Sequence, residues 1–336
     1  MARNIGLDLG SGKTSIVLRG RGTVLCEPTV AVINEEAEEM VAIGEKAAQM
    51  IGKVPPELSV CYPVRFGSVV HCDEACAMLY EYLARAAGTM PGKKNVLCAL
   101  PGRTTEIERL ALEEVILDAG AKDVLFMQEA LLAAAGAGLR ITQARGSMVI
   151  DIGAGTTEIA VISMGAVVAS ESLRVAGDAF DAAIESYLRR TYGVIVDGTM
   201  ARSLKEQIGA LNEQTEETAQ LCGRNAVSGL PMTLTVHTAE LIPPLREVAS
   251  SIAEGACRVL ENTPAEMAAD ILQDGIMLCG GGALLRGLDE FLAQKCHAPV
   301  QIAAAPTACT AEGLAKMLSY KGDIETLFRL QGRQKA

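Results

Sequence analysis

The chain has 336 residues, of which 49% are hydrophobic and 21% charged, and its formal net charge is −11. This length predicts two domains or one large two-lobed body with enough apolar side chains for a sizeable core. The acidic balance argues against nucleic acid as a partner, and no apolar run is long enough to span a membrane.

The first thirty residues read as strands separated by glycine turns: NIGLDLG, TSIVLRG and GTVLCEPTVAVI. Gly10, Ser11 and Gly12 therefore form a tight hairpin after the first strand. The letters GSGKT also resemble the end of a P-loop. A P-loop, however, needs its first glycine where this chain has Leu7, and a helix where this chain has a strand. We reject that interpretation.

The ten cysteines are scattered through apolar segments, and no signal peptide precedes them. This pattern favours free cytosolic thiols that pack as small hydrophobic side chains. His71, Cys72 and Cys76 form one local cluster, which either holds a metal ion or consists of partly buried helix residues. The second interpretation is favoured, because the cluster lacks CxxC spacing and a fourth ligand.

Between residues 95 and 138 the pattern changes to strands that alternate with helices. NVLCALP and DVLFM are short buried strands, whereas TTEIERLALEEVILDAG and EALLAAAGAG are helices. In the longer helix Thr105 and Glu108 have the spacing of a capping box, and Gly120 ends the helix. This alternation predicts an α/β sheet with helices packed on it.

The opening pattern returns at Ser147, in the stretch SMVIDIGAGTTEIAVISMGAVVASESL. Both copies read Asp-x-Gly-x-Gly-x-Thr after an apolar strand, beginning at Asp8 and at Asp151. A repeat at this spacing is too long for a solenoid and predicts two similar lobes that face each other. A third glycine site, GIMLCGGGALLRGLDEFL, reads as a strand, three glycines and an amphipathic helix.

Two facing glycine hairpins can clamp a polyphosphate, because glycine exposes backbone N–H groups and lets phosphate oxygens approach closely. Hydroxyl donors are expected from Ser11, Thr14, Thr156 and Thr157. Asp8 and Asp151 stand at strand ends beside the phosphates, where carboxylates can hold a hydrated Mg²⁺. The simpler alternative for either hairpin alone is an ordinary turn.

Together these features resemble the actin-like ATPase superfamily, and within it the MreB family of bacterial actins. The resemblance is carried by IGLDLGSGKTSIVLRGRGTVLCEPTVAVI, SMVIDIGAGTTEIAVISMG, RVAGDAFDAAIESYLRRTYG and GIMLCGGGALLRGLDEFL, and it runs from about Asn4 to Leu318. It implies an α/β, actin-like two-lobed fold of duplicated ribonuclease-H-like domains with a nucleotide cleft between the lobes. The implied first lobe has a core of residues 1–29, 64–140 and 319–336 and a small subdomain of residues 30–63. The second has a core of residues 141–177 and 246–318 and a small subdomain of residues 178–245.

The resemblance further implies a site for ATP and Mg²⁺. Its expected nucleotide-binding residues are Gly10, Ser11, Gly12, Lys13, Ala154, Gly155, Thr156, Arg202, Lys205, Gly281, Gly282, Ala283 and Leu284. Asp8 and Asp151 are expected to hold Mg²⁺ through water. Lys13, where the family usually has asparagine, either strengthens nucleotide binding or points into solvent. Arg202, where the family has glutamate, is expected to stack on adenine.

The same resemblance identifies Glu129 as the carboxylate that orients the attacking water, helped by Thr156. Without the resemblance, Glu129 would be read as a helix N-terminal acid stabilised by the helix dipole. Gln128 and Ala130 flank it where the family has glutamate and proline. Such departures leave open a divergent paralogue that binds nucleotide, hydrolyses it slowly and acts as a scaffold or regulator.

Members of the family form ATP-dependent paired protofilaments at the inner face of the cytoplasmic membrane and organise cell-wall synthesis and rod shape. The expected partners are therefore further copies of the chain, that membrane face and the wall-synthesis machinery, and the expected location is cytoplasmic and peripheral to the membrane. Met90, Pro91, Lys93 and Lys94 offer a weak membrane contact, or they form an ordinary surface loop. A small-molecule kinase of the same fold is less favoured, because large substrate-binding insertions are missing.

Overall fold

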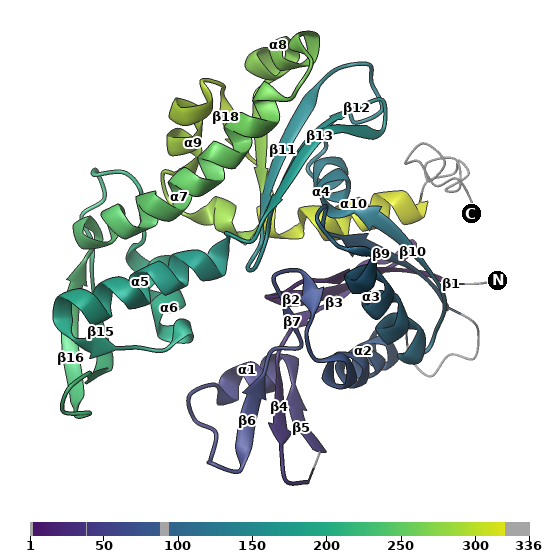
Figure 1. Cartoon of the computed structure of the whole chain (residues 1–336). Coiled ribbons are helices and arrows are strands. Elements are labelled where there is room, and N and C mark those ends of the chain that lie inside the picture. The colour runs from purple at the N-terminus through teal and green to yellow at the C-terminus, as the bar shows by residue number, and fades with distance from the viewer. Residues whose placement is uncertain (1–2, 38, 88–93, 320–336) are drawn as a thin grey trace.

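Two five-stranded sheets of matching topology form the frame of the molecule (Figure 1). The computed structural model describes residues 3–37, 39–87 and 94–319. The first sheet has the strand order β10 (Ala121–Gln128), β9 (Lys94–Leu100), β1 (Arg3–Leu9), β2 (Lys13–Leu18) and β3 (Gly22–Pro28). The second has the order β18 (Val300–Ile302), β17 (Ile276–Cys279), β11 (Ser147–Ile152), β12 (Thr157–Ser163) and β13 (Ala166–Leu173).

The strand pairing confirms the repeat predicted from the sequence. In each sheet the strand that precedes the glycine turn pairs antiparallel with the strand after it and parallel with its neighbour on the other side. Asp8 lies opposite Ser15 in the first hairpin, and Asp151 lies opposite Glu158 in the second. The two aspartates therefore occupy the same register position in two copies of one motif.

Two helices lie between the sheets, α4 (Glu129–Gly136) and α10 (Cys309–Ser319) (Figure 1). They pack so closely that a Cβ at Gly136 would lie 1.8 Å from the carbonyl oxygen of Cys309. A Cβ at Gly313 would lie 2.0 Å from the carbonyl oxygen of Leu132. Small residues in these two helices therefore allow their backbones to approach closely, and the helices form one apolar core between the two lobes. Residues of α10 and of both sheets share one apolar core. The residue numbers at which one lobe core ends and the other begins therefore stay a prediction.

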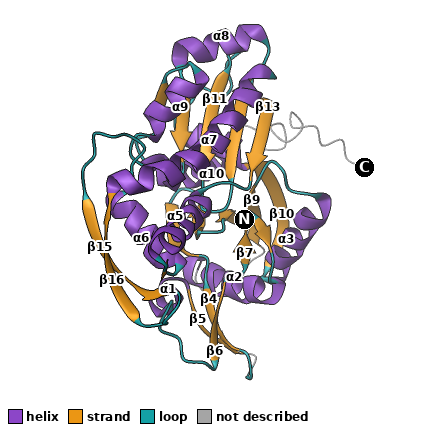
Figure 2. Cartoon of the chain, turned by 60° about the vertical axis from the view of Figure 1, so that its left-hand side comes forward, coloured by secondary structure: helices purple, strands orange, loops and turns teal. Residues whose placement is uncertain are grey.

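Further helices cover the outer faces of the sheets, as Figure 2 shows. On the first sheet these are α2 (Cys72–Ala87) and α3 (Glu106–Asp118). The capping box of Thr105 and Glu108 is formed, and Gly120 follows the helix with φ +101°. On the second sheet they are α7 (Thr238–Glu261), α8 (Ala265–Asp274) and α9 (Leu288–Cys296), and α5 (Gly177–Tyr192) packs against α7.

Each lobe also carries a small three-stranded sheet with a helix. One consists of β4 (Ala31–Asn34), β5 (Glu39–Ile43) and β6 (Leu58–Cys61) with α1 (Gly44–Met50). The other consists of β14 (Val194–Ile195), β15 (Thr218–Asn225) and β16 (Pro231–His237) with α6 (Gly198–Ile208). A short hairpin, β7 (Val64–Arg65) and β8 (Ser68–Val69), leads from β6 to α2.

Two expectations concern the surface of the chain. Among the described helices, none has the length and apolar character needed to cross a membrane. Of the predicted membrane contact, Met90, Pro91 and Lys93 lie outside the described residues, and Lys94 begins β9.

The ten cysteines are free thiols, as the sequence predicts, and five of them are buried.

Candidate functional site

A cavity of about 750 Å³ lies between the lobes, where the two glycine hairpins meet. Its size suits a ligand as large as a nucleotide. The predicted site residues that line it are Asp8, Gly10, Ser11, Gly12, Lys13, Glu129, Asp151, Ala154, Gly155, Thr156, Arg202, Lys205, Gly281, Gly282 and Leu284. Residues far apart in the sequence are therefore brought together around one space.

Ala283 is the exception among the predicted nucleotide-binding residues. Its side chain is fully buried in the core of the second lobe and does not line the cavity. The 3₁₀ helix η1 (Gly281–Leu284) directs the alanine inward while its neighbours Gly282 and Leu284 line the cavity. We correct this prediction: Ala283 supports the turn from behind.

Two of the four expected hydroxyl donors also point elsewhere. Thr14 Oγ1 forms a hydrogen bond of 2.9 Å with Thr29 Oγ1, and Thr157 Oγ1 donates to the carbonyl oxygen of Val175 at 2.7 Å. Both threonines are buried strand residues, and side chains alternate between the faces of a strand. Ser11 and Thr156, which belong to the turns, are the two that line the cavity.

The two glycine hairpins close in the same way. The N–H of Gly10 donates to the carbonyl oxygen of Lys13 at 3.1 Å, and the N–H of Gly153 donates to that of Thr156 at 2.9 Å. Each bond narrows its turn and leaves the intervening residues at the tip. Both tips line the cavity, so the predicted clamp of two hairpins has the required geometry.

The hairpins also pack against each other, which sets a steric requirement for glycine. A Cβ at Gly12 would lie 2.7 Å from the Cβ of Ala154. A Cβ at Gly155 would lie 2.7 Å from Ser11 Oγ and 2.9 Å from the backbone nitrogen of Phe66. These glycines therefore allow the lobes to touch, in addition to any role with a ligand.

The three glycines of the third site differ in how closely they are packed. Gly280 has φ +81°, and a Cβ at Gly282 would lie 2.3 Å from Ile152 Cγ2. Both positions hold the turn close to the end of β11. Gly281, in contrast, has no neighbouring atom of the described residues within 4 Å of its Cβ position. Close packing of the turn against β11 therefore explains two of the three glycines.

Acidic side chains gather at the base of the cavity. Asp8 and Asp151 are both buried, and burial raises the pKa of each to about 6. Lys13 opposes both shifts through its charge. The charge of Asp151 adds to the shift at Asp8, whereas a hydrogen bond of 3.0 Å from Thr310 Oγ1 lowers the pKa of Asp151.

Two glutamates complete this acidic group. Glu129 begins α4 and lines the cavity, and desolvation together with the charges of Asp8 and Asp151 holds its pKa well above the usual value. Glu158 is buried on β12, where burial raises its pKa against hydrogen bonds from Ser172 and from the N–H of Gly102. Like charges in one dry region disfavour ionisation of all of them.

The acidic group fits a divalent cation. Carboxylate oxygens are the ligands that Mg²⁺ prefers, and a cation would relieve the repulsion that raises these pKa values. Asp8 and Asp151 would hold such an ion at the paired strand ends, with Glu129 nearby. The metal position at Asp8 and Asp151 stays a prediction, and the chemistry of the side chains around it suits such an ion.

Lys13 spans the cleft from the first lobe. Its Nζ donates to the carbonyl oxygen of Thr307 in η2 (Pro306–Ala308) of the second lobe. The side chain is half-buried and lines the cavity. Of the two positions expected for this lysine, the structure therefore has the one inside the cleft.

The far end of the cavity is formed by α5 and α6. Arg202 contacts Asp178 Oδ1 at 2.9 Å and Asp181 Oδ2 at 3.1 Å. Lys205 Nζ lies 2.6 Å from Asp181 Oδ1 and donates to the carbonyl oxygen of Gly177 at 2.9 Å. The guanidinium of Arg202, expected to stack on adenine, is thus held by two carboxylates.

Several lining residues were missed by sequence reasoning. They are Gly67, Asp178, Phe180, Glu206, Gln207, Arg286, Thr307 and Thr310, among others. The stretch RVAGDAF, which contributes to the family resemblance, was a signal for two of them. Gly67 had no such signal, because only the folded chain brings the β7–β8 hairpin to the cavity.

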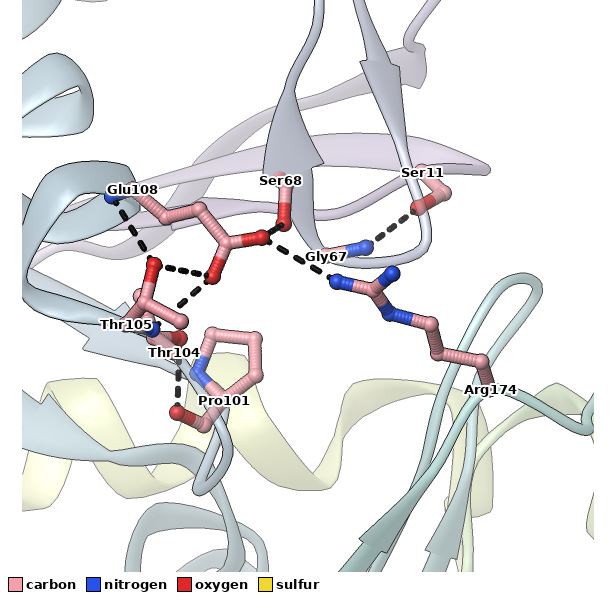
Figure 3. A network of polar contacts seen from close by, with 8 residues as sticks. All are labelled: Ser11, Gly67, Ser68, Pro101, Thr104, Thr105, Glu108 and Arg174. Atoms are coloured by element: carbon pink, nitrogen blue, oxygen red, sulfur yellow. Dashed lines mark hydrogen bonds and ion pairs between the residues drawn. The ribbon is translucent and has the colours of Figure 1, made fainter.

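That hairpin belongs to a polar network between the lobes (Figure 3). The N–H of Gly67 donates to Ser11 Oγ at 3.1 Å. Beside it Ser68 Oγ donates to Glu108 Oε1 at 2.7 Å, and Arg174, which follows β13, donates to the same oxygen at 3.1 Å. The hydrogen bond from Ser68, those from the backbone N–H and hydroxyl of Thr105, and the charge of Arg174 lower the pKa of Glu108 to about 2. The helix-capping glutamate therefore also connects the two lobes.

Comparison with known proteins places these features in one family. Residues 2–326 match the family described as MreB/Mbl protein. The cell shape-determining protein Mbl of Bacillus subtilis is 38% identical over 319 residues, which cover 94% of this chain and 96% of that protein. The cell shape-determining protein MreB of Escherichia coli is 37% identical over 334 residues, with 96% of each chain covered.

A solved structure supports the fold directly. The crystal structure of MreB5 of Spiroplasma citri bound to AMPPNP matches with a TM-score of 0.88 and 35% identity. The match covers 93% of this chain and 95% of that one. The predicted actin-like two-lobed fold is therefore confirmed.

Proposed function

The chain belongs to the MreB/Mbl family, and from this premise we propose that it binds and hydrolyses Mg-ATP and assembles into membrane-associated filaments. These filaments would direct cell-wall synthesis and maintain rod shape. One observation carries the proposal: two duplicated glycine hairpins face each other across a cavity that also contains paired aspartates and Glu129.

Phosphate binding is supported by the two hairpin tips. Backbone N–H groups of Ser11 and Gly12 and of Ala154–Thr156 are available for a polyphosphate from both lobes, and Ser11 and Thr156 add hydroxyl groups. Lys13 lies in the same wall, where its ammonium group would favour the β- and γ-phosphates. The match to a relative that binds AMPPNP supports a nucleotide as the ligand.

Nucleoside recognition would fall to the opposite end of the cavity. Lys205, Glu206, Gly281 and Leu284 line that region. The carboxylate of Glu206 can accept hydrogen bonds from ribose hydroxyl groups. Glu206 lies one helical turn after Arg202, the position at which the family has a glutamate. The apolar side chain of Leu284, which is 61% exposed, would pack on the base.

For hydrolysis we assign Glu129 to the attacking water. Its raised pKa reflects burial beside Asp8 and Asp151, so its protonation depends on how much negative charge the site holds. A bound Mg²⁺ would neutralise charge on the phosphates and on the aspartates. Glu129 would then be ionised, accept a hydrogen bond from water and orient it, with Thr156 beside it at the second hairpin.

Phosphate release and nucleotide binding, measured on the same preparations, test this assignment. Replacing Glu129 with Gln should slow hydrolysis by about 10²–10⁴-fold, because a neutral amide cannot polarise the attacking water as a carboxylate does. ATP affinity should change little, because the hairpins remain. The matched control is Glu114→Gln, which changes an exposed glutamate on α3. Unchanged hydrolysis in Glu129→Gln would contradict the role, and very slow hydrolysis in the unmodified chain would favour the scaffold alternative.

A further inference from the structure

A second cluster of metal-binding side chains lies outside the cleft. Cys61, His71 and Glu74 each present one ligand atom, and these atoms all lie within 4.8 Å of one another. They come from the end of β6, the residue before α2 and the first turn of α2. We propose that these three residues bind a divalent metal ion of the zinc class.

The chemistry of the three groups selects the class of metal. A thiolate, an imidazole and a carboxylate are all ligands of Zn²⁺, whereas Mg²⁺ and Ca²⁺ prefer oxygen ligands alone. The thiol proton is released to solvent when the metal binds. Three protein ligands leave a fourth, open position, which water would fill because His71 is exposed. The bound metal ion would therefore be able to dissociate into solvent and be replaced by another ion.

The geometry requires only a small adjustment. Bond lengths of about 2.0–2.3 Å place tetrahedral ligand atoms roughly 3.3–3.8 Å apart, so the present separations would shorten by about 1.5 Å at most. Cys61 is buried and fixed by its pairing with Ala31 in the small sheet. His71 is exposed and Glu74 half-buried, so their side chains can move toward the fixed thiol.

This set differs from the cluster that the sequence suggests. His71 belongs to both, but the folded chain brings Cys61 and Glu74 beside it in place of Cys72 and Cys76. Cys72 is exposed and Cys76 half-buried. The two cysteines of α2 therefore provide matched controls on the same helix.

A metal at this position would act on the hairpin that leads to the nucleotide cleft. The chain between Cys61 and His71 contains β7 and β8, and Gly67 at their turn donates to Ser11. The metal would tie the two ends of this segment together at its base. We expect slower amide exchange in residues 64–69 when the metal is bound.

Cobalt titration of the reduced, metal-free full chain tests the proposal. Co²⁺ reports thiolate ligation by a charge-transfer absorption band, and competition with Zn²⁺ then measures affinity for zinc. The expected result is one equivalent of bound cobalt with a thiolate band. Removal of a metal-bound side chain should weaken binding by at least about 10–100-fold, which is the loss seen for residues that only support such ligands. Cys61→Ser should abolish the band. Glu74→Gln should weaken cobalt binding, and because Glu74 is only half-buried this change should leave the core packing intact.

The controls decide between the two clusters. Cys72→Ser and Cys76→Ser should keep both the band and the affinity. Loss of the band in either of them, with the band kept in Cys61→Ser, would overturn the proposal in favour of the cluster on α2. Absence of a thiolate band in the unmodified chain would also overturn it. Circular dichroism of each variant establishes that it is folded.

Discussion

At the scale of single residues, the cleft contains carboxylates whose burial disfavours their charged forms. Asp8 and Asp151 are buried, and burial raises the pKa of both to about 6. A group whose folded pKa lies above its unfolded value binds more protons in the folded state. Its contribution to stability therefore decreases as the pH rises from about 4 to about 6.

Replacing Asp8 with Asn should stabilise the nucleotide-free protein at pH 7 and weaken Mg-ATP binding. Removal of one buried charge raises the free energy of unfolding by on the order of 1–2 kcal/mol. Loss of a charged metal contact weakens Mg-ATP affinity by at least about tenfold. Urea denaturation and nucleotide titration measure the two effects, with Asp118→Asn as an exposed control at the end of α3. Lower stability of Asp8→Asn at pH 7 would contradict the electrostatic account.

Much of the candidate site could be predicted residue by residue, because its members follow glycine turns and strand ends. Ala283 could not be placed, since the direction of a side chain in a 3₁₀ turn depends on the packing behind it. The contacts of Arg202 were also missed. Its partners Asp178 and Asp181 belong to a different helix, and pairing between helices is not encoded in local sequence.

At the scale of elements, the glycine hairpins connect packing with function. Their register follows from apolar alternation and turn length, which the sequence displays. Their contact across the cleft does not, because it depends on how two lobes are positioned by α4 and α10. The steric need for glycine at position 155 follows from that contact.

Gly155→Ala should therefore destabilise the protein by about 1–3 kcal/mol, the usual range for an overpacked site. The added methyl group would meet Ser11 Oγ and the backbone of Phe66. Gly281 lines the same cavity, but an added methyl group there would meet nothing within 4 Å in the part of the chain that the structure describes, so Gly281→Ala should change the free energy of unfolding little. Chemical denaturation of both variants provides the comparison. Equal stability of the two would show that the hairpins do not press against each other.

The network around Glu108 gives a pH-dependent prediction. Because the folded pKa of about 2 lies below the usual value of 4.5, this carboxylate stabilises the protein above about pH 4.5 and loses that effect as the pH falls toward 2. Glu108→Gln should lower the free energy of unfolding at pH 7 by about 1–2 kcal/mol and flatten its decline in acid. Glu114→Gln on the same helix is the control. An unchanged acid profile would exclude Glu108 from this role.

At the scale of the whole molecule, the internal repeat predicted the architecture. Two copies of one strand–turn–strand motif became two sheets of matching topology with a cavity between them. What the repeat could not predict are the links across that cavity, because they join residues that lie far apart in the sequence. Lys13 contacts Thr307, the N–H of Gly102 donates to Glu158, and Arg174 donates to Glu108.

These links suggest how nucleotide and assembly are connected. Each joins one lobe to the other beside the hairpins, so a ligand between the hairpins would change the balance of contacts that hold the lobes together. We propose that Mg-ATP favours the arrangement of lobes that assembles into filaments. The family of the chain supports assembly, and the position of the cleft supports its dependence on nucleotide.

The most direct test is electron microscopy of the purified chain on an anionic lipid monolayer, with Mg-ATP and without nucleotide. We predict paired filaments on the lipid with Mg-ATP and none without nucleotide. Glu129→Gln should still assemble with Mg-ATP, because it keeps the binding site and loses hydrolysis. Measured ATP binding without filaments on the lipid would contradict the account and leave a nucleotide-binding scaffold as the function.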